Sequence, residues 1–383
     1  MKITEIRATP VSARTTRSNA WSRGKGTGFS RTIIEIDTDQ GLTGLGEAPR
    51  GDTAEVVNRY FAPRLIGLDP GEWQTARLRC LPRNRDWGLI GDARERMAFG
   101  GVDMALWDLV GKALGRPLFR VLGGPVREVA PFVAYAYSVD TSEGITERQV
   151  PDQMAEVARR SIAETGARVF EFKVGRNSVD CEIETVRAVR AALGPDIGLS
   201  LDANMGYTVG EARRLLQGIV DVGILNFEEP VAGLGEMQKL RAEFGVPMST
   251  HCTNFEALKH YPLIDSVVAD FHHEGGIVPT LMLGAVAQAQ HRQFWLHTYQ
   301  ELGISWAARC HFGMVCPEAR HPAQALINWV VDDLVLGEPW RVHSGGYRPP
   351  EKPGLGVELD PDGFAHAAEM YRKEGELAYL VAR

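Results

Sequence analysis

The sequence contains few cysteines, no excess of positive charge and no long apolar run. Its five cysteines are an odd number in 383 residues and lack paired CxxC spacing, so we expect reduced thiols. The net charge of −7 argues against nucleic acid or an anionic membrane as a partner. No apolar run approaches the length of a membrane span, and the strand-like N-terminus does not look like a signal peptide, so we expect a cytoplasmic protein.

Low-complexity segments are also absent, and the one internal repeat is a strand–helix period. Six short apolar runs end in an ionisable or metal-competent side chain, and these residues are Lys173, Asp202, Glu228, His251, Asp270 and His297. Successive members are 29, 26, 23, 19 and 27 residues apart, about one strand and one helix each. This alternation predicts a parallel sheet closed into a (β/α) barrel. In such barrels the active site lies at the carboxyl ends of the strands.

The chain is longer than one core usually organises, so a smaller domain is expected beside the barrel. Alternating strands at Ile3–Pro10, Arg31–Thr38 and Leu42–Glu47 predict an antiparallel meander, and the apolar stripe of Arg96–Leu114 predicts a packed helix. Phe132–Val139 is expected to form the first barrel strand. The last barrel strand is expected within Ala325–Trp340.

A segment rich in Gly and Ser, Thr15–Ser30, separates the first two predicted strands and carries Arg17, Asn19 and Arg23. Composition alone favours a solvated loop. The functional alternative is a lid whose cations meet an anionic substrate.

Several motifs, in chain order, carry a family resemblance. They are TDQGLTGLGEAPRGD, GGVDMALWDLVGKALGRP, FKVG, LDAN, FEEP, the pair Asp270 and His297, and PGLGVELD. Together they resemble the enolase superfamily, and most closely its glucarate dehydratase group of acid-sugar dehydratases. The likeness spans nearly the whole chain, and the ordered set is far more specific than any single motif.

The resemblance implies a (β/α)7β TIM-like barrel under an α+β capping domain. The cap would comprise residues 1–125 and the tail 341–383, and the barrel would comprise residues 126–340. Relatives of this kind commonly assemble as homo-oligomers, which is therefore expected here.

The chemistry that such a site performs begins with a weak carbon acid. Removing the α-proton of a carboxylate creates an enediolate, and a bound divalent cation stabilises the charge that develops. Asp202 and Glu228 are hard oxygen ligands that suit Mg²⁺, and the resemblance puts ligands at these positions. The third ligand position is occupied by His251, with Asn254 as a nearby alternative. Because imidazole is a softer ligand, Mn²⁺ competes with Mg²⁺ in this expectation.

Asp270 and His297 are expected to form a dyad. A carboxylate hydrogen-bonded to one ring nitrogen would orient the imidazole and favour its protonated form, which serves a base that later acts as an acid. The alternative is a structural ion pair. The neighbouring His272, His273 and Glu274 are expected to surround the site or lie at the surface.

Lys173 matches the second lysine of the family's Lys-x-Lys motif, whereas the first lysine is replaced by Glu171. A carboxylate beside Lys173 would keep that lysine protonated and make it a poorer base. We therefore expect His297 to take the α-proton and Lys173 to contact the substrate as a cation. Glu171 is either an acid toward the leaving hydroxyl or a contact for a distal hydroxyl.

The remaining substrate contacts follow from the resemblance. Tyr135 and Asn204 match substrate-contacting positions of the family, whereas Tyr299 stands where the family has Asn, and Arg17 and Arg23 lie in the loop near Asn19. The implied substrate is a small carboxylate, an aldonate or aldarate.

The preferred function is a metal-dependent dehydratase that removes an α-proton and a β-hydroxyl and yields a 2-keto-3-deoxy acid. A racemase, epimerase or cycloisomerase acting through the same enediolate is the first alternative. The second alternative is a non-catalytic protein that binds a metal or a sugar acid.

Overall fold

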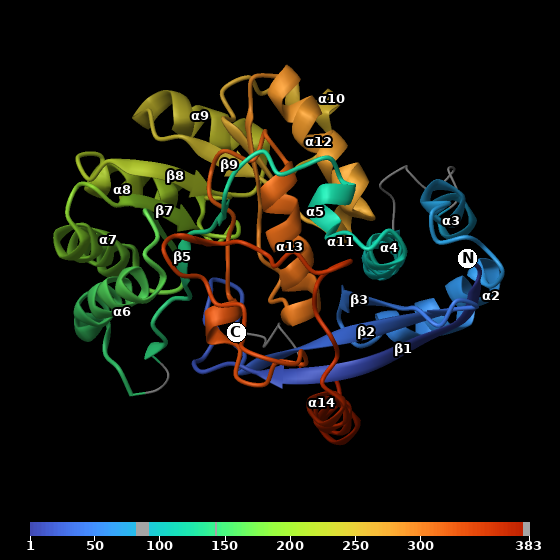
Figure 1. The fold of residues 1–383 in the computed structure, drawn as a ribbon. Helices are drawn as coiled ribbons and strands as arrows, with labels where there is room; N and C mark the ends of the chain where they lie inside the picture. The colour runs from blue at the N-terminus through green and yellow to red at the C-terminus, as the bar shows by residue number, and fades with distance from the viewer. Residues whose placement is uncertain (82–91, 142–143, 378–383) are drawn as a thin grey trace.

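A computed structural model describes residues 1–81, 92–141 and 144–377. Two sheets organise the molecule: an antiparallel one near the N-terminus and a curled parallel one (Figure 1). Within the described ranges, none of the helices combines the length and apolar character needed to cross a bilayer. All five cysteines are free thiols, as expected.

The N-terminal sheet confirms the predicted meander, with longer strands. Its order is β1 (Ile3–Arg14), β2 (Gly28–Thr38) and β3 (Thr43–Pro49), all antiparallel. The predicted helix is α4 (Asp92–Ala113), which packs on β3. This close packing requires glycine, because a Cβ placed on Gly46 would lie 2.0 Å from the backbone oxygen of Gly101.

Short helices connect β3 to α4 and α4 to the barrel. They are α1 (Thr53–Val56), a π-helical turn (Val57–Phe61), α2 (Ala62–Leu65), α3 (Trp73–Cys80) and α5 (Leu118–Val121). Buried apolar residues of the helices before α4, such as Phe61 and Leu65, join a core with β1, β2 and α4.

The parallel sheet contains seven strands in the order β11-β10-β9-β8-β7-β6-β5. They are β5 (Ala134–Ala136), β6 (Val169–Lys173), β7 (Gly198–Asp202), β8 (Ile224–Glu228), β9 (Met248–Thr250), β10 (Ser266–Ala269) and β11 (Gln293–Leu296). All six predicted strand ends are confirmed. Lys173 is in register with Asp202, and Asp202 with Glu228, so these side chains share one edge.

The gap between β11 and β5 is spanned by the segment at Ala323 and Gln324. Ala323 forms a parallel bridge to Phe132, and the amide of Gln324 donates to the Leu296 carbonyl at 3.0 Å. The expectation that the last strand lies within Ala325–Trp340 was therefore wrong by a few residues. The chain turns there into a 3-10 helix, Ile327–Trp329.

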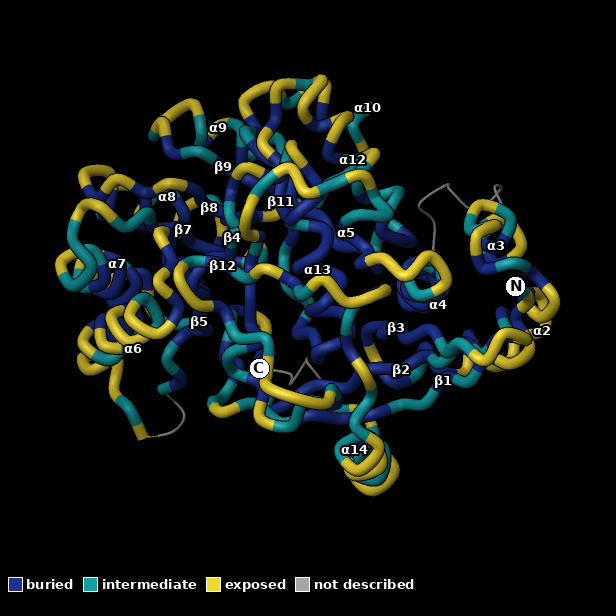
Figure 2. The backbone as a smooth tube through the Cα atoms, viewed as in Figure 1, coloured by how far each residue is buried: buried dark blue, intermediate teal, exposed yellow. Residues whose placement is uncertain are grey.

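Helices cover the outside of the parallel sheet. They are α6 (Val150–Thr165), α7 (Val179–Leu193), α8 (Val209–Ile219), α9 (Leu234–Phe244), α10 (Phe255–Leu258), α11 (Phe271–Glu274), α12 (Ile277–Ala289) and α13 (Gly303–Val315), with a 3-10 turn at Glu147–Gln149. In α8 a capping box of Thr208 and Glu211 starts the helix, and an apolar stripe faces the sheet. Figure 2 shows the outer faces of such helices exposed and the strands buried.

The C-terminal segment returns to the N-terminal sheet, as predicted. Strand β12 (Gly346–Tyr347) pairs with β4 (Ala130–Pro131), and α14 (Pro361–Glu374) packs on β1. Arg14 and Glu374 form an ion pair at 2.7 Å across this contact. The domain division at residues 125 and 340 stays a prediction.

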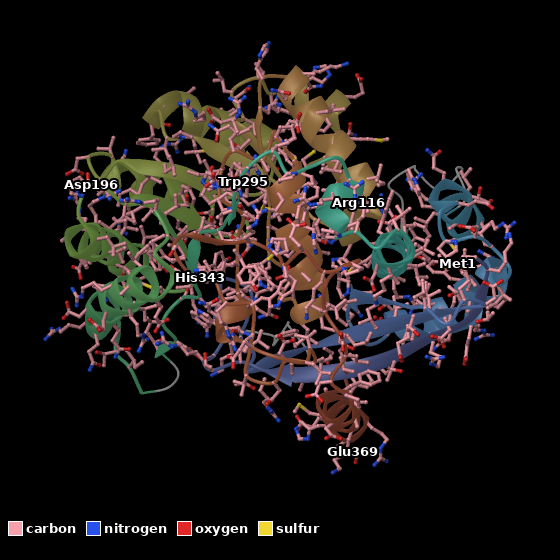
Figure 3. All side chains as sticks on the ribbon, viewed as in Figure 1. Met1, Arg116, Asp196, Trp295, His343 and Glu369 are labelled. Atoms are coloured by element: carbon pink, nitrogen blue, oxygen red, sulfur yellow. The ribbon has the colours of Figure 1, made fainter. Side chains whose placement is uncertain are left out.

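The strand ends lie deep in the molecule. Figure 3 places Trp295 of β11 in the interior, whereas Asp196, in the turn before β7, is at the periphery.

Candidate active site

Three buried carboxylates meet at the ends of neighbouring strands. Glu171 is 0% exposed, Asp202 1% and Glu228 0%, and one oxygen from each lies within 4.8 Å of the others. The expected proximity of Asp202 and Glu228 is confirmed, and Glu171 joins them. Among the described residues, Oε2 of Glu171 has no hydrogen-bond partner.

This carboxylate cluster, Glu171, Asp202 and Glu228, favours the binding of positive charge. Burial raises the pKa of Glu171 well above its usual range, and the charges of Glu228 and Asp202 add to the effect. Burial, followed by the charge of Asp202, also raises the pKa of Glu228. Three hard oxygen donors with an unpartnered buried oxygen among them fit a divalent cation such as Mg²⁺.

His251 lies beside this cluster. Its Nε2 is 3.0 Å from Oε1 of Glu228. Burial opposes protonation of the ring, but the Glu228 carboxylate raises the pKa of His251 to about 9. His251 as the third ligand stays a prediction, and the carboxylate cluster offers Glu171 as an alternative.

Lys173 is held by the end of the next strand. Its Nζ donates to Oδ2 of Asp202 and to Oδ1 of Asn204, and it lies 5.7 Å from the centre of the Trp21 ring. The expected carboxylate partner was Glu171, but the hydrogen-bonded one is Asp202. The hydroxyl of Tyr135 donates to the same Asp202 oxygen at 3.4 Å. The side chains of Lys173, Tyr135 and Asn204 therefore lie together at the carboxyl end of β7.

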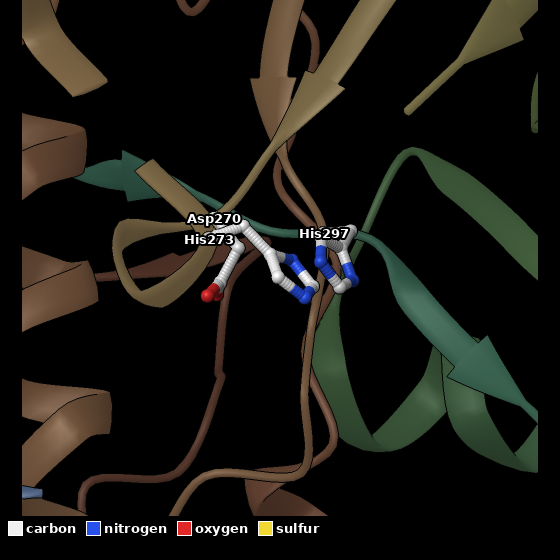
Figure 4. Close-up of side chains that lie close together, drawn as sticks. All are labelled: Asp270, His273 and His297. Atoms are coloured by element: carbon white, nitrogen blue, oxygen red, sulfur yellow. The ribbon is translucent and has the colours of Figure 1, made fainter. Parts of the chain in front are cut away.

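The expected hydrogen bond between Asp270 and His297 was wrong. Oδ1 of Asp270 accepts from the His272 amide at 2.8 Å and contacts Nδ1 of His272 at 2.9 Å. Nδ1 of His297 instead contacts the Thr298 carbonyl at 2.9 Å. Asp270 is the N-cap of α11, so its side chain turns toward the first turn of that helix. Figure 4 shows Asp270 and His297 near each other, with His273 beside them.

The expectation that the protonated form of His297 is favoured was also wrong. Burial lowers the pKa of His297 well below its usual range, and the charge of His251 acts in the same direction. The two rings have their centres 4.7 Å apart. His297 is therefore neutral and has a ring nitrogen that can accept a proton, while the positive charge of His251 beside it weakens it as a base.

A cavity of about 280 Å³ opens at this part of the site. Its lining includes His251, Asp270, His273 and His297, together with Arg96 from α4. Sequence analysis missed Arg96. The apolar stripe of this helix predicts core packing, but it does not indicate which polar side chain of the helix reaches the cavity.

The loop between β1 and β2 folds back as a hairpin over the barrel. Backbone hydrogen bonds join Asn19 to Gly26 and Trp21 to Gly24, and the Ser22 hydroxyl donates to the Ala203 carbonyl at 2.8 Å. It therefore contacts the end of β7, next to Asp202.

The three side chains singled out in this loop differ in their surroundings. Asn19 is 3% exposed, and among the described residues both polar atoms of its side chain lack a partner. The Arg17 guanidinium lies 5.5 Å from the centre of the Trp329 ring. Arg23 is exposed and donates from Nε to the Asn204 carbonyl at 3.1 Å. Only Asn19 is buried with polar atoms available to a ligand.

Two further residues that sequence analysis missed hold the strand ends. The Gln324 amide donates to Oε1 of Glu171 and to Oε2 of Glu228, the latter at 3.2 Å. Arg309, 1% exposed, donates to the carbonyls of His297 at 2.5 Å and Gln324 at 2.8 Å. Both act across long sequence separations, which no local pattern reveals.

The N-terminal sheet is tied to this region through Glu47. Its carboxylate accepts from Nε of Arg31 at 2.7 Å and from the amides of Leu302 and Ser305 at the start of α13. The Glu47 carbonyl contacts Nε2 of His272 at 2.8 Å, and Arg31 donates to the Tyr299 carbonyl at 3.2 Å. The Tyr299 ring lies beside His297, with centres 5.8 Å apart.

Two family models match the chain. The one described as "Enolase C-terminal domain-like" covers residues 153–363, and "Mandelate racemase / muconate lactonizing enzyme, N-terminal domain" covers residues 6–123. A probable glucarate dehydratase from Streptomyces coelicolor is 29% identical over an alignment of 364 residues, gaps included, that covers 88% of this chain and 84% of the relative. A D-galactarolactone cycloisomerase from Agrobacterium fabrum is 30% identical over an alignment of 353 residues, gaps included, that covers 87% of this chain and 90% of the relative.

Solved structures show the same fold. An enolase from Streptomyces coelicolor, described as a putative sugar isomerase, has a TM-score of 0.90 at 29% identity, covering 99% of this chain and 100% of its own. An enolase from Thermobispora bispora complexed with magnesium and formate has a TM-score of 0.86 at 29% identity, covering 98% and 94%.

Proposed function

The chain belongs to the enolase superfamily, in its mandelate racemase and muconate lactonizing enzyme branch, and we propose that it is a Mg²⁺-dependent dehydratase of an acid sugar. The reaction would remove the α-proton and the β-hydroxyl of an aldonate or aldarate and yield a 2-keto-3-deoxy acid. Mn²⁺ is the alternative cation.

One observation carries this proposal: only the side chain of His251 separates the carboxylate cluster, which fits a cation, from the neutral imidazole of His297. His251 contacts Glu228 of the carboxylate cluster on one side and the ring of His297 on the other. A cation bound at the cluster would supply positive charge beside the substrate carboxylate and the developing enediolate. The ring centre of His297 lies 4.7 Å from that of His251, whose Nε2 contacts Glu228.

The residues of the chain then divide the work. Nε2 of His297 is buried and has no hydrogen-bond partner among the described residues, so it is the atom that would take the α-proton. Lys173 would exchange part of its contact with Asp202 for the substrate, as a cation rather than a base. When Glu171 is not a ligand of the cation, its raised pKa lets it hold a proton. It can then donate that proton to the leaving hydroxyl.

Substrate contacts are proposed for the residues around this centre. Asn19 and Tyr135 are buried near the strand ends, and Asn204 is already bonded to Lys173. Tyr299 lies beside His297. Arg17 and Arg23 would require a movement of the hairpin to reach the substrate.

The relatives support the reaction class. Besides the probable glucarate dehydratase, D-galactonate dehydratase from Variovorax paradoxus is 27% identical over 357 residues. The complex of the Thermobispora bispora enolase with magnesium and formate supports a divalent cation together with a small carboxylate.

A cycloisomerase or other isomerase is the second candidate. It is favoured by the similarity to D-galactarolactone cycloisomerase and by Lys173 and His297 approaching from different strands. The hydrogen bond from Lys173 to Asp202 weakens the lysine as a second base, so dehydration is preferred.

The test is a screen of the purified protein with Mg²⁺ against mono- and diacid sugars, with chemical detection of 2-keto acid and NMR detection of α-deuterium in D₂O. Keto acid from one or a few sugars, lost on chelation, is the expected result. Exchange without keto acid would favour the isomerase, and ligand binding with neither signal would favour a non-catalytic binder.

A further inference from the structure

We propose that Asp270, His273 and His297 form a second cation site, separate from the carboxylate cluster, which takes a transition ion such as Zn²⁺ in preference to Mg²⁺. One donor atom from each of the three lies within 4.8 Å of the other two. The His273 and His297 rings are nearly parallel, at an interplanar angle of 15° and with their centres 6.0 Å apart. Figure 4 shows these two side chains together with Asp270.

Two of the three side chains of this site present buried polar atoms, which distinguishes it from a group of surface residues. Asp270 is 1% exposed, and its Oδ2 has no hydrogen-bond partner among the residues described. Nε2 of His297 is likewise buried and unpartnered within the described ranges. Buried polar atoms normally have partners, and these two atoms are available to a ligand.

The donors are in the protonation states that a metal requires. Although burial favours the neutral acid, the imidazole of His272 holds the pKa of Asp270 well below its usual range. Burial lowers the pKa of His273, and it lowers that of His297 well below its usual range. At neutral pH the site therefore offers one carboxylate and two neutral imidazoles.

Room for an ion comes from the cavity of about 280 Å³, which all three residues line. Ligand atoms on one tetrahedral zinc ion lie roughly 3.3 Å apart, so small side-chain rotations would bring the donors together. The cavity leaves the fourth position to water.

Positive charges around the site oppose a cation: Arg96 lines the same cavity, and the imidazolium of His251 has its ring centre 4.7 Å from that of His297. A further opposing charge, next to Asp270, is Arg309. Its Nη1 lies 3.9 Å from Oδ2 of Asp270 and would repel a cation. That nitrogen also donates to the His297 carbonyl and forms an ion pair with Glu301 at 3.2 Å. The Glu301 carboxylate therefore offsets part of the positive charge of Arg309. The expected affinity is accordingly below that of a structural zinc site.

Selectivity follows from the donor types. Two imidazoles and one carboxylate favour Zn²⁺ or Co²⁺, whereas a set of carboxylates alone favours Mg²⁺. The two neighbouring sites therefore select different ions from the same solution.

The consequence for catalysis rests on the proposed function. An ion on Nε2 of His297 occupies the lone pair that would accept the α-proton. Zn²⁺ would then inhibit the Mg²⁺-supported reaction without displacing Mg²⁺.

The decisive experiment is calorimetric titration of the full-length protein with Zn²⁺ at saturating Mg²⁺. We expect one Zn²⁺ per chain and at least a tenfold weaker affinity in His273→Ala. His260→Ala, at an exposed histidine, and Cys252→Ser, at the one thiol that is not buried, should bind as the wild type does. Circular dichroism confirms that each variant is folded.

Three results would overturn the proposal: no binding, binding unchanged by His273→Ala, or binding abolished by Cys252→Ser. Binding lost in Glu228→Gln but retained in His273→Ala would assign the ion to the carboxylate cluster instead. These results do not depend on turnover, so they separate failure of this site from failure of the dehydratase proposal. Where turnover is found, His273→Ala should raise the half-inhibitory Zn²⁺ concentration at least tenfold.

Discussion

Nε2 of His251 lies 3.0 Å from Oε1 of Glu228, so an imidazolium stands where positive charge is needed beside three buried carboxylates. The pKa of His251 is raised to about 9 by this contact. The same carboxylates attract a divalent cation, and the two positive charges compete for Glu228.

Binding of Mg²⁺ should therefore release protons. Below pH 9 His251 carries a proton that the incoming cation disfavours, so affinity should rise with pH from about 7 toward 9. Calorimetry in buffers of different ionisation enthalpy measures the number of protons released. His251→Asn should flatten the pH dependence, whereas equal proton release in that variant would assign the proton to another group.

Glu171→Gln should weaken Mg²⁺ binding at least tenfold, which corresponds to about 1.4 kcal/mol. The reason is loss of one of three carboxylate oxygen donors. His251→Ala serves as the comparison and should leave the Mg²⁺ affinity within about threefold of the wild-type value. If instead His251→Ala weakens Mg²⁺ binding more than Glu171→Gln does in direct titration, the result would support the prediction of His251 as the third ligand and leave Glu171 to act on the substrate.

His297→Asn should abolish α-proton exchange with D₂O, with a loss of at least a thousandfold, as expected for removal of a general base. Lys173→Met should retain measurable exchange while raising KM, because Lys173 is held as a cation by Asp202. NMR of the substrate α-position measures both. Exchange that survives in the His297 variant and disappears in the Lys173 variant would reverse the two roles.

Glu47→Gln should destabilise the protein by about 3 kcal/mol, because it leaves the buried charge of Arg31 without a charged partner. Both side chains are at most 1% exposed. The matched control is Asp221→Asn, which breaks the exposed pair with Arg187 and should leave the unfolding midpoint unchanged. Urea unfolding compares them, and equal midpoints for the two variants would show that Glu47 is not needed to join the sheet to α13.

How far sequence reasoning reached depends on whether a feature is local. The strand ends at Lys173, Asp202 and Glu228 were correctly predicted, because an apolar run that stops at a polar residue is a pattern within a few residues. The N-cap role of Asp270 is equally local, since Asp precedes a helical turn, but it was not predicted.

The composition and the spacing of the strands were enough to predict a barrel and the residue types that gather at the carboxyl ends of its strands. Tertiary structure alone decided which neighbour each side chain chose: His272 for Asp270, Asp202 for Lys173, and Gln324 for Glu171. The physical reason is that hydrogen bonds act over about 3 Å, whereas strand register places residues only to within several ångströms. The partner of each buried side chain therefore depends on details of packing that strand register alone does not specify.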